Sequence, residues 1–270
     1  MSRLHILKGF SDLESALWVL KDKPGLQRPD MVRTVREKGF TVTNKAYEIV
    51  LLLGEWGLVE GKQQKLTPDG NEFYTLWEKN PNVAVDVLHG LQYGLWSQCT
   101  PEQHIASWAY QQVCDYLWDY QILPEDENLV SHIYDNFFDI RNAAFDSKSV
   151  KGAYDWLLPL SPPVFKGVSE SSSGRRNFKK ATFIRRTSCS PALFLMGLSW
   201  MAREAGNEFG ELVAIDRERR LSVCRFCLIE ENQFDFMLKE TLRRFSYISV
   251  QRTVGLYLTI EREPKIADFY

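Results

Sequence analysis

The sequence has no run of about 18 uninterrupted apolar residues, so we expect no membrane-spanning helix. It also shows no signal peptide, because the short apolar stretch near the N-terminus is followed at once by acidic residues. A cytoplasmic protein is the default expectation. The five cysteines, an odd number at irregular spacing, do not suit a disulfide framework and are expected to be reduced.

Common catalytic signatures are missing as well. The chain contains no HExxH and no glycine-rich nucleotide signature, and its SSSGRR run lacks the GxxxxGK[ST] pattern of a phosphate loop. His89, His104 and His132 are far apart in sequence and are expected to be satisfied or exposed rather than metal ligands. We therefore predict no cofactor, no metal and no small-molecule substrate.

The only CxxC pair is formed by Cys224 and Cys227. A structural zinc site needs four ligands, and the nearest other cysteine, Cys189, lies 35 residues upstream of Cys224. A site of three cysteines completed by a distant residue stays open. The favoured interpretation is two thiols that lie at this spacing by coincidence.

A metal-dependent nuclease is a further alternative. Such a site needs an acidic residue at one strand end and a carboxylate-x-Lys on a neighbouring strand, which together hold Mg²⁺ and activate water. Glu263 and Lys265 have the second pattern, and Asp216 is the best candidate for the first.

Charge is distributed unevenly along the chain, whose net charge is −2. Residues 1–80 carry 12 basic and 11 acidic side chains, a net of +1, whereas residues 81–165 carry 3 and 11, a net of −8. Residues 166–270 carry 18 and 13, a net of +5. Such segregation concerns partners rather than fold, and it predicts that the acidic middle repels nucleic acid while the flanks attract it.

Residues 41–77 predict a helix, a sharp stop, a short hairpin and a second helix. The first helix begins after Thr43 or Asn44, and apolar residues recur along it at helical spacing. Gly57 is expected to end it in a left-handed conformation. Residues 58–60 and 65–67 are predicted as paired strands around a turn at 61–64, and Thr67 caps the next helix.

This stretch resembles the recognition helix and wing of a winged-helix domain, with predicted helices at 11–20, 29–38 and 68–78 around it. The resemblance implies that the recognition helix enters a DNA groove and that the hairpin lies along the phosphates. The residues it assigns to nucleic acid are Arg33, Arg36, Thr43, Asn44, Lys45, Tyr47, Lys62, Gln63, Gln64 and Lys65. Winged helices also mediate protein contacts, so that interpretation stays open.

Residues 81–165 are predicted to be mostly helical and rich in aromatic residues. Aromatic residues at helical spacing favour a core or a subunit interface over a base-stacking surface, because a stacking groove needs cations beside it. The acidic charge of this segment supports the core interpretation.

Residues 166–190 have the composition of a linker or loop and contain a basic cluster with phenylalanines between the charges. This composition is typical of a nucleic-acid backbone contact. The cluster is Arg175, Arg176, Lys179, Lys180, Arg185 and Arg186. A solvated linker, or a basic patch that docks on the acidic middle segment, are the alternatives.

The C-terminal part, residues 191–270, begins with an apolar helix capped by Ser190. Residues 210–232 are ambiguous between strand and helix, a second helix is predicted at 232–245, and two β-rich runs follow around a Thr-Val-Gly break. This order matches a second winged-helix-like unit.

We therefore predict a mainly α fold with small β-structure (α+β), divided into residues 1–80, 81–165, 166–190 and 191–270. The predicted function is non-enzymatic binding of double-stranded DNA, as a transcription regulator or as the DNA-binding subunit of a larger bacterial complex. A winged-helix scaffold subunit that contacts proteins is the alternative, with the nuclease second. A protein partner or a homodimer stays open.

Overall fold

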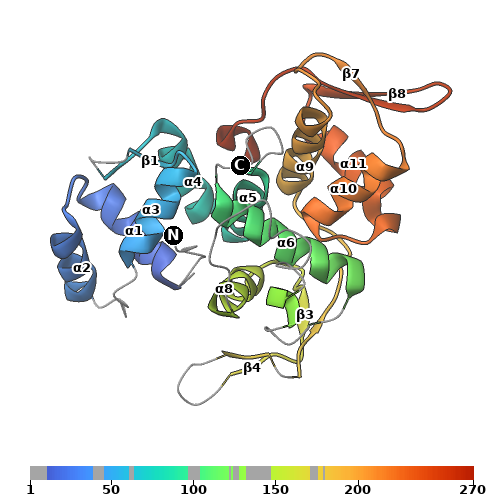
Figure 1. Cartoon of the computed structure of the whole chain (residues 1–270). Coiled ribbons are helices and arrows are strands. Elements are labelled where there is room, and N and C mark those ends of the chain that lie inside the picture. The colour runs from blue at the N-terminus through green and yellow to red at the C-terminus, as the bar shows by residue number, and fades with distance from the viewer. Residues whose placement is uncertain are drawn as a thin grey trace.

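The computed structural model shows a mainly helical protein with small antiparallel sheets, which confirms the predicted fold class (Figure 1). None of the described helices is long and apolar enough to cross a membrane. The residues that the structure describes are 11–38, 46–60, 64–96, 104–121, 123, 128–131, 147–170, 176–178 and 180–270.

The N-terminal unit, defined as residues 11–79, contains four helices and a short hairpin. Its apolar core is built on the first helix, where Leu13, Ala16, Leu17 and Leu20 are buried at the helical spacing expected from the sequence. The elements in order are α1 (Ser11–Asp22), α2 (Arg28–Glu37), α3 (Ala46–Glu55), β1 (Val59–Glu60), β2 (Lys65–Leu66) and α4 (Pro68–Lys79).

The transition from α3 to the hairpin follows from local sequence. Gly57 has a φ of +72°, and the amide of Leu58 donates to the carbonyl of Leu53 at 2.8 Å, which is a helix C-cap of the Schellman type. Thr67 caps α4 through its hydroxyl, which accepts from the amide of Gly70 at 3.0 Å and donates to the carbonyl of Gly57 at 2.7 Å. The Thr67 side chain therefore links Gly57, just before the hairpin, to the first turn of α4, just after it.

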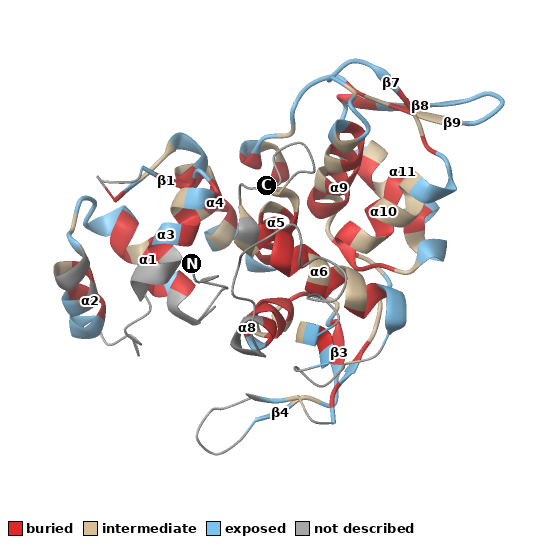
Figure 2. Ribbon diagram, viewed as in Figure 1, coloured by how far each residue is buried: buried red, intermediate tan, exposed pale blue. Residues whose placement is uncertain are grey.

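The middle of the molecule is organised around α5 (Pro81–Gly94), which packs against α4, α6 and α9 (Figure 1). Helices α6 (Ile105–Tyr120) and α8 (Ser147–Leu157) complete the described part of this layer. Figure 2 shows many buried residues along these helices, and the apolar core continues from α1 to the C-terminal end. The middle and the C-terminal part therefore share one core.

The predicted core role is confirmed for three of the aromatic residues that the structure describes. Trp108, Tyr110 and Trp118 are buried, whereas Tyr120 is 55% exposed. Tyr134, Phe137 and Phe138 lie outside the described residues.

The C-terminal unit, defined as residues 191–270, has three helices and a three-stranded antiparallel sheet. The ambiguous stretch resolves into a strand followed by a helix, and the strand order in the sheet is β7-β9-β8. The predicted cap is confirmed, because the Ser190 hydroxyl accepts from the amide of Leu193. The elements are α9 (Pro191–Glu204), β7 (Leu212–Ala214), α10 (Arg217–Cys227), η2 (Glu231–Gln233), α11 (Phe234–Arg244), β8 (Ile248–Arg252), β9 (Leu256–Ile260) and η3 (Ile266–Phe269).

The last residues join the two units. The short helix η3 packs against α4 of the N-terminal unit. Tyr270 hydrogen-bonds the Glu72 carboxylate, and the Lys79 ammonium lies 4.3 Å from the centre of the Tyr270 ring. On the other side, Asp268 accepts two hydrogen bonds from the Arg262 guanidinium at 2.9 Å, so the segment is held from both units.

Between α6 and α10, Asp115 is a source of pH-dependent stability. Desolvation raises its pKa to about 7, although its side chain is 31% exposed, while the Tyr93 hydroxyl donates to its carboxylate at 2.5 Å. A raised carboxyl pKa means that the folded state holds the proton more tightly than the unfolded chain. The contribution of Asp115 to stability is therefore present below about pH 4 and is lost as the pH rises towards 7.

We expect Asp115→Asn to stabilise the protein more at pH 8 than at pH 5, because an amide carries no charge to desolvate and still accepts from Tyr93. Melting temperatures of the variant and the wild type at pH 5, 6, 7 and 8 measure this. A difference between the two proteins that does not change with pH would contradict the assignment.

Candidate nucleic-acid interface

The structure places the two arginines predicted on α2 at the surface. Arg33 and Arg36 are both exposed, and the Arg33 side chain is 68% exposed. The Arg33 guanidinium lies 2.7 Å from the Asp30 carboxylate, one turn earlier in the helix. This exposed pair leaves Arg33 free to exchange partners, since surface ion pairs contribute little stability.

Most of the predicted recognition residues lie outside the described part of the chain. Thr43, Asn44, Lys45, Lys62 and Gln63 are not described. Tyr47 belongs to α3, but its side chain is not described either. Their assignment to nucleic acid stays a prediction.

The two hairpin residues that are described behave differently. Lys65 is exposed at the start of β2 and is available for a phosphate. Gln64 is only 8% exposed and has a left-handed backbone with a φ of +45°. Its carbonyl accepts from the amide of Gly25 at 3.2 Å. The predicted contact between the Gln64 side chain and nucleic acid is therefore wrong, because the turn directs this residue inward.

The basic cluster does not lie in a linker. Four two-residue strands lie within this stretch: β3 (Phe165–Lys166) pairs with β6 (Thr182–Phe183), and β4 (Ser169–Glu170) pairs with β5 (Arg176–Asn177). The stretch predicted as a linker or loop therefore contains paired strands, which join residues 6 to 18 positions apart. Lys180 is exposed, Arg176 lies in β5, and Arg175 and Lys179 are outside the described residues.

Arg185 turns away from these strands and stacks on Trp118 of α6. Its guanidinium carbon lies 3.8 Å from the ring centre, and its Nε and Nη2 donate to the Trp118 carbonyl at 3.0 and 2.7 Å. Desolvation lowers the pKa of Arg185. This arginine already uses two of its donors inside the protein, so the structure does not group it with the exposed lysines.

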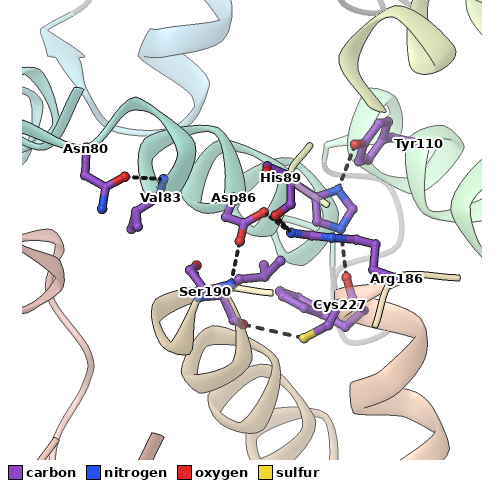
Figure 3. A network of polar contacts seen from close by, with 11 residues as sticks. Asn80, Val83, Asp86, His89, Tyr110, Arg186, Ser190 and Cys227 are labelled. Carbon is purple, nitrogen blue, oxygen red and sulfur yellow. Dashed lines mark hydrogen bonds and ion pairs between the residues drawn. The ribbon is translucent and has the colours of Figure 1, made fainter. Parts of the chain in front are cut away.

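Arg186 is buried at 1% exposure, and its predicted contact with nucleic acid is wrong. Its Nη2 donates to Asp86 Oδ1 at 2.8 Å and to the Ser161 carbonyl at 2.6 Å (Figure 3). The second Asp86 oxygen accepts from the amide of Ser190 at 2.7 Å, so one carboxylate of α5 joins Arg186 to the start of α9. For Arg186 the structure therefore matches the alternative that the basic cluster docks on the acidic middle segment, although the local pattern does not specify the partner 100 positions away.

His89 lies close to this ion pair and is satisfied, as the sequence predicts (Figure 3). Its Nδ1 lies 2.8 Å from the Tyr110 hydroxyl and its Nε2 lies 2.8 Å from the Phe226 carbonyl. Because a carbonyl only accepts, Nε2 carries the proton and Nδ1 accepts from Tyr110. Burial lowers the pKa of His89 to about 3, so the ring is neutral at pH 7.

The CxxC thiols of α10 are core residues. Cys224 and Cys227 are fully buried, and burial raises the pKa of Cys224 to about 12. Metal binding needs the thiolate, which this environment disfavours. Within the described part of the chain, no group of three His, Cys, Asp or Glu side chains is arranged to hold a metal ion.

The residues of the alternative nuclease site are not brought together. Asp216 follows β7 at the end where the amide of Ile215 donates to the Leu256 carbonyl at the start of β9. Glu263 and Lys265 follow the opposite end of β9. The five residues of β9 alone separate the two positions by roughly 13 Å, too far for two carboxylates to share one cation. Asp216 instead caps α10 by accepting from the amide of Arg219 at 2.8 Å.

The sequence did not assign any contact residue to α11, although the structure presents a polar face there. Phe236, Lys239 and Arg243 are exposed, with Glu240 half-buried between them, at the spacing of one helix face. Beside it, Arg252 of the β8–β9 hairpin lies 3.8 Å from Asp235 at the start of α11. The amphipathic pattern of residues 234–244 was the available signal for this face.

A polar pocket of about 580 Å³ lies next to the turn between α10 and α11. Its charges are mixed, with two arginines facing three carboxylates, so it does not offer the uniformly positive surface that phosphates require. It is lined by Gln121, Arg185, Arg220, Glu230, Glu231, Asn232 and Asp235.

Comparisons with protein-family models, with curated proteins and with solved structures found no match to this chain.

Proposed function

We propose that this chain is a non-enzymatic protein that binds double-stranded DNA through two units of the winged-helix type. The observation that carries the proposal is the architecture of the C-terminal unit. Helix, strand, two helices and a hairpin follow one another there, and the strand order is β7-β9-β8. A winged helix has this order, with its third helix in the major groove and its last hairpin as the wing.

In this arrangement α11 is the helix that enters the groove. Its outward cations are Lys239 and Arg243, and both are exposed. Arg243 pairs with Glu240 at 2.7 Å, an exposed contact that it can exchange for a phosphate. The β8–β9 hairpin projects from the molecule beside this unit, with Arg252 73% exposed and Val254 fully exposed near its tip (Figure 1). An exposed cation on a projecting hairpin suits contact with a neighbouring phosphate.

The N-terminal unit is the second proposed DNA-binding unit. Helices α1 to α3, the β1–β2 hairpin and α4 follow the order that the resemblance implies. The proposed contacts are α3 in the groove, through Thr43, Asn44, Lys45 and Tyr47, and the hairpin on phosphate. Arg33, Arg36, Lys62, Gln63 and Lys65 are the proposed accessory contacts.

This function suits a cytoplasmic transcription regulator or the DNA-binding subunit of a larger complex. The net charge of +1 over residues 1–80 is low for a protein that binds DNA with one unit. The basic segment at residues 166–190, with seven basic side chains and one acidic side chain, compensates for that weakness, whereas residues 191–270 carry 11 basic and 12 acidic side chains and add no net positive charge.

A gel-shift titration with duplex DNA between 50 and 200 mM salt tests the function. We expect the wild type to bind at low salt and to weaken steeply, because each phosphate contact releases counterions. Replacing both α11 cations, as Lys239→Gln with Arg243→Gln, should reduce the slope of log K against log salt by up to about two.

Arg203→Gln is the matched control, since Arg203 is a 54% exposed arginine on α9, outside the proposed interface. It should bind as the wild type does. The proposal fails if the wild type does not shift duplex DNA at 50 mM salt, or if the α11 variant binds with an unchanged slope.

One observation favours the alternative of a scaffold subunit. Phe236 is 54% exposed on the outer face of α11, where an exposed aromatic residue suits a protein contact. Under this alternative, Phe236→Ser weakens self-association or partner binding in sedimentation experiments, and the wild type leaves duplex DNA unshifted.

A further inference from the structure

The polar pocket beside the turn from α10 to α11 is built on a backbone that is fixed from two sides. The Trp118 indole donates to the Ile229 carbonyl at 2.8 Å, which fastens α6 to this turn. The amide of Arg186 donates to the Leu228 carbonyl at 2.7 Å, and the amide of Glu230 donates to the Arg186 carbonyl at 3.0 Å. These three hydrogen bonds hold in place the chain that carries the side chains of the pocket.

Arg185 lines this pocket as a cation held in one orientation. Its guanidinium stacks on the Trp118 ring, and its Nε and Nη2 both donate to the Trp118 carbonyl. Its Nη1 has no hydrogen-bond partner among the described residues. An arginine that is already ordered in this way can bind an anion with little further loss of side-chain entropy.

Glu230 places a negative charge in the same pocket. Its side chain is half-buried, and its carboxylate forms no ion pair with a described residue. Desolvation lowers the pKa of Arg185, and the nearby charges of Asp119 and Glu230 oppose that shift, so the carboxylate acts on the guanidinium without pairing with it. Two opposite charges arranged in this way can bind the two opposite charges of one small molecule.

The described lining of the pocket has more negative than positive charge. It carries two arginines and three carboxylates, a net of −1. Arg220 lies 3.2 Å from the Asp235 carboxylate, so these two charges offset one another. Glu231 lies 3.7 Å from Arg217, an exposed arginine outside the pocket. Because exposed ion pairs contribute little stability, Glu231 can exchange this partner for a cation of a ligand.

We infer that this pocket binds a free basic α-amino acid, of which arginine and lysine are the two probes. The ligand carboxylate accepts from Nη1 of Arg185, and its α-ammonium donates to the Glu230 carboxylate. Its positively charged side chain lies against Glu231 and neutralises the net charge of −1. The volume of about 580 Å³ is within the range of roughly 300–1,000 Å³ found for small-molecule sites.

Isothermal titration calorimetry of the full chain at pH 7 tests the inference with a series of ligands. We expect saturable binding of one L-arginine or one L-lysine per chain, and none of L-glutamate, whose side chain meets like charge. Agmatine lacks the carboxylate and N-acetyl-L-arginine lacks the ammonium, so each should bind about tenfold or more weakly than L-arginine. Absence of saturable L-arginine binding, or equal binding of L-glutamate, would overturn the inference.

Glu230→Gln tests the ammonium contact while keeping the shape of the side chain. It should raise the Kd for L-arginine about tenfold or more, and leave the Kd for N-acetyl-L-arginine unchanged because that ligand has no ammonium to lose. Glu204→Gln is the matched control, since Glu204 is a half-buried glutamate of α9 that lies outside the pocket and forms no ion pair with a described residue. It should bind L-arginine as the wild type does.

Wild-type affinity of Glu230→Gln for L-arginine would overturn the inference, and the ligand series on the wild type decides the matter even if this variant is unstable. The calorimetry contains no DNA, so its result does not depend on the proposed function. A wild type that shifts duplex DNA but binds no amino acid overturns this inference alone. A wild type that binds L-arginine but leaves duplex DNA unshifted supports this inference and overturns the proposed function.

Discussion

Asp86→Ala is expected to lower the free energy of unfolding by about 3–5 kcal/mol, the range for breaking a buried ion pair on one side. Asp86 of α5 is 2% exposed, and its carboxylate is the ionic partner of the buried Arg186 guanidinium. The variant leaves a full positive charge with only the Ser161 carbonyl as its described hydrogen-bond partner. It also removes the acceptor for the amide of Ser190 at the start of α9.

Urea titrations of the wild type and the variant measure this loss. The double variant Asp86→Leu with Arg186→Met should recover most of the stability, because no unpaired charge then remains in the core. Glu240→Ala is the matched control, since its partner Arg243 is 63% exposed, and it should change stability by about 0.5 kcal/mol at most. Equal effects at the buried and the exposed pair would contradict the assignment.

The ion pair also explains how distant parts of the chain become one body. Asp86 belongs to the acidic middle segment and Arg186 to the basic segment, while Ser190 caps α9, the first helix of the C-terminal unit. A single carboxylate contacts both Arg186 and Ser190, so loss of Asp86 should loosen the junction between α5 and α9 as well as destabilise the fold. DNA binding by Asp86→Ala is expected to weaken for this indirect reason.

Gly70→Ala is expected to destabilise the N-terminal unit by about 3 kcal/mol or more. A Cβ on Gly70 would lie 1.9 Å from the Leu58 carbonyl oxygen and 2.9 Å from its carbonyl carbon, and neither backbone atom can turn aside. Helix α4 and the strand β1 would have to separate. Because the contact between Gly70 and Leu58 holds the hairpin against α4, the proposed DNA binding by the N-terminal unit should also be lost in this variant.

Gly54→Ala provides the matched control in the same unit. Gly54 lies inside α3, and the nearest atom to its added Cβ is the Val59 carbonyl oxygen at 3.9 Å, an ordinary contact. Alanine in a helix interior is favoured over glycine by about 0.5–1 kcal/mol, so this variant should be slightly more stable than the wild type. Urea titrations that give both variants the same sign would contradict the close approach at Gly70.

Local features of the fold were predictable because their causes lie within a few residues. The positive φ of Gly57, the cap at Thr67 and the cap at Ser190 all follow from chemistry within one helical turn. The β8–β9 hairpin likewise joins neighbours in sequence. The burial of Leu13, Ala16 and Leu17 follows from their spacing alone.

Contacts between distant segments were not predictable in this way. Arg185 and Arg186 belong to the same basic run as Lys180, yet one stacks on a tryptophan of α6 and the other pairs with α5. Gln64 is polar and lies at a turn, yet it is buried. Charge and hydrophobicity describe each side chain, but its accessibility depends on which segment folds over it.

The sequence by itself determined the mainly helical fold, the caps of the helices, the core role of Trp108, Tyr110 and Trp118 and the uneven charge. These properties depend on composition and short-range periodicity. Only the tertiary structure decided that the supposed linker contains paired strands, that the nuclease candidates lie at opposite ends of a strand, and that two of the six clustered cations serve the interior. The physical reason is that these contacts join residues 6 to 18 positions apart in the paired strands and 100 positions apart in the ion pair, and no local pattern specifies such partners.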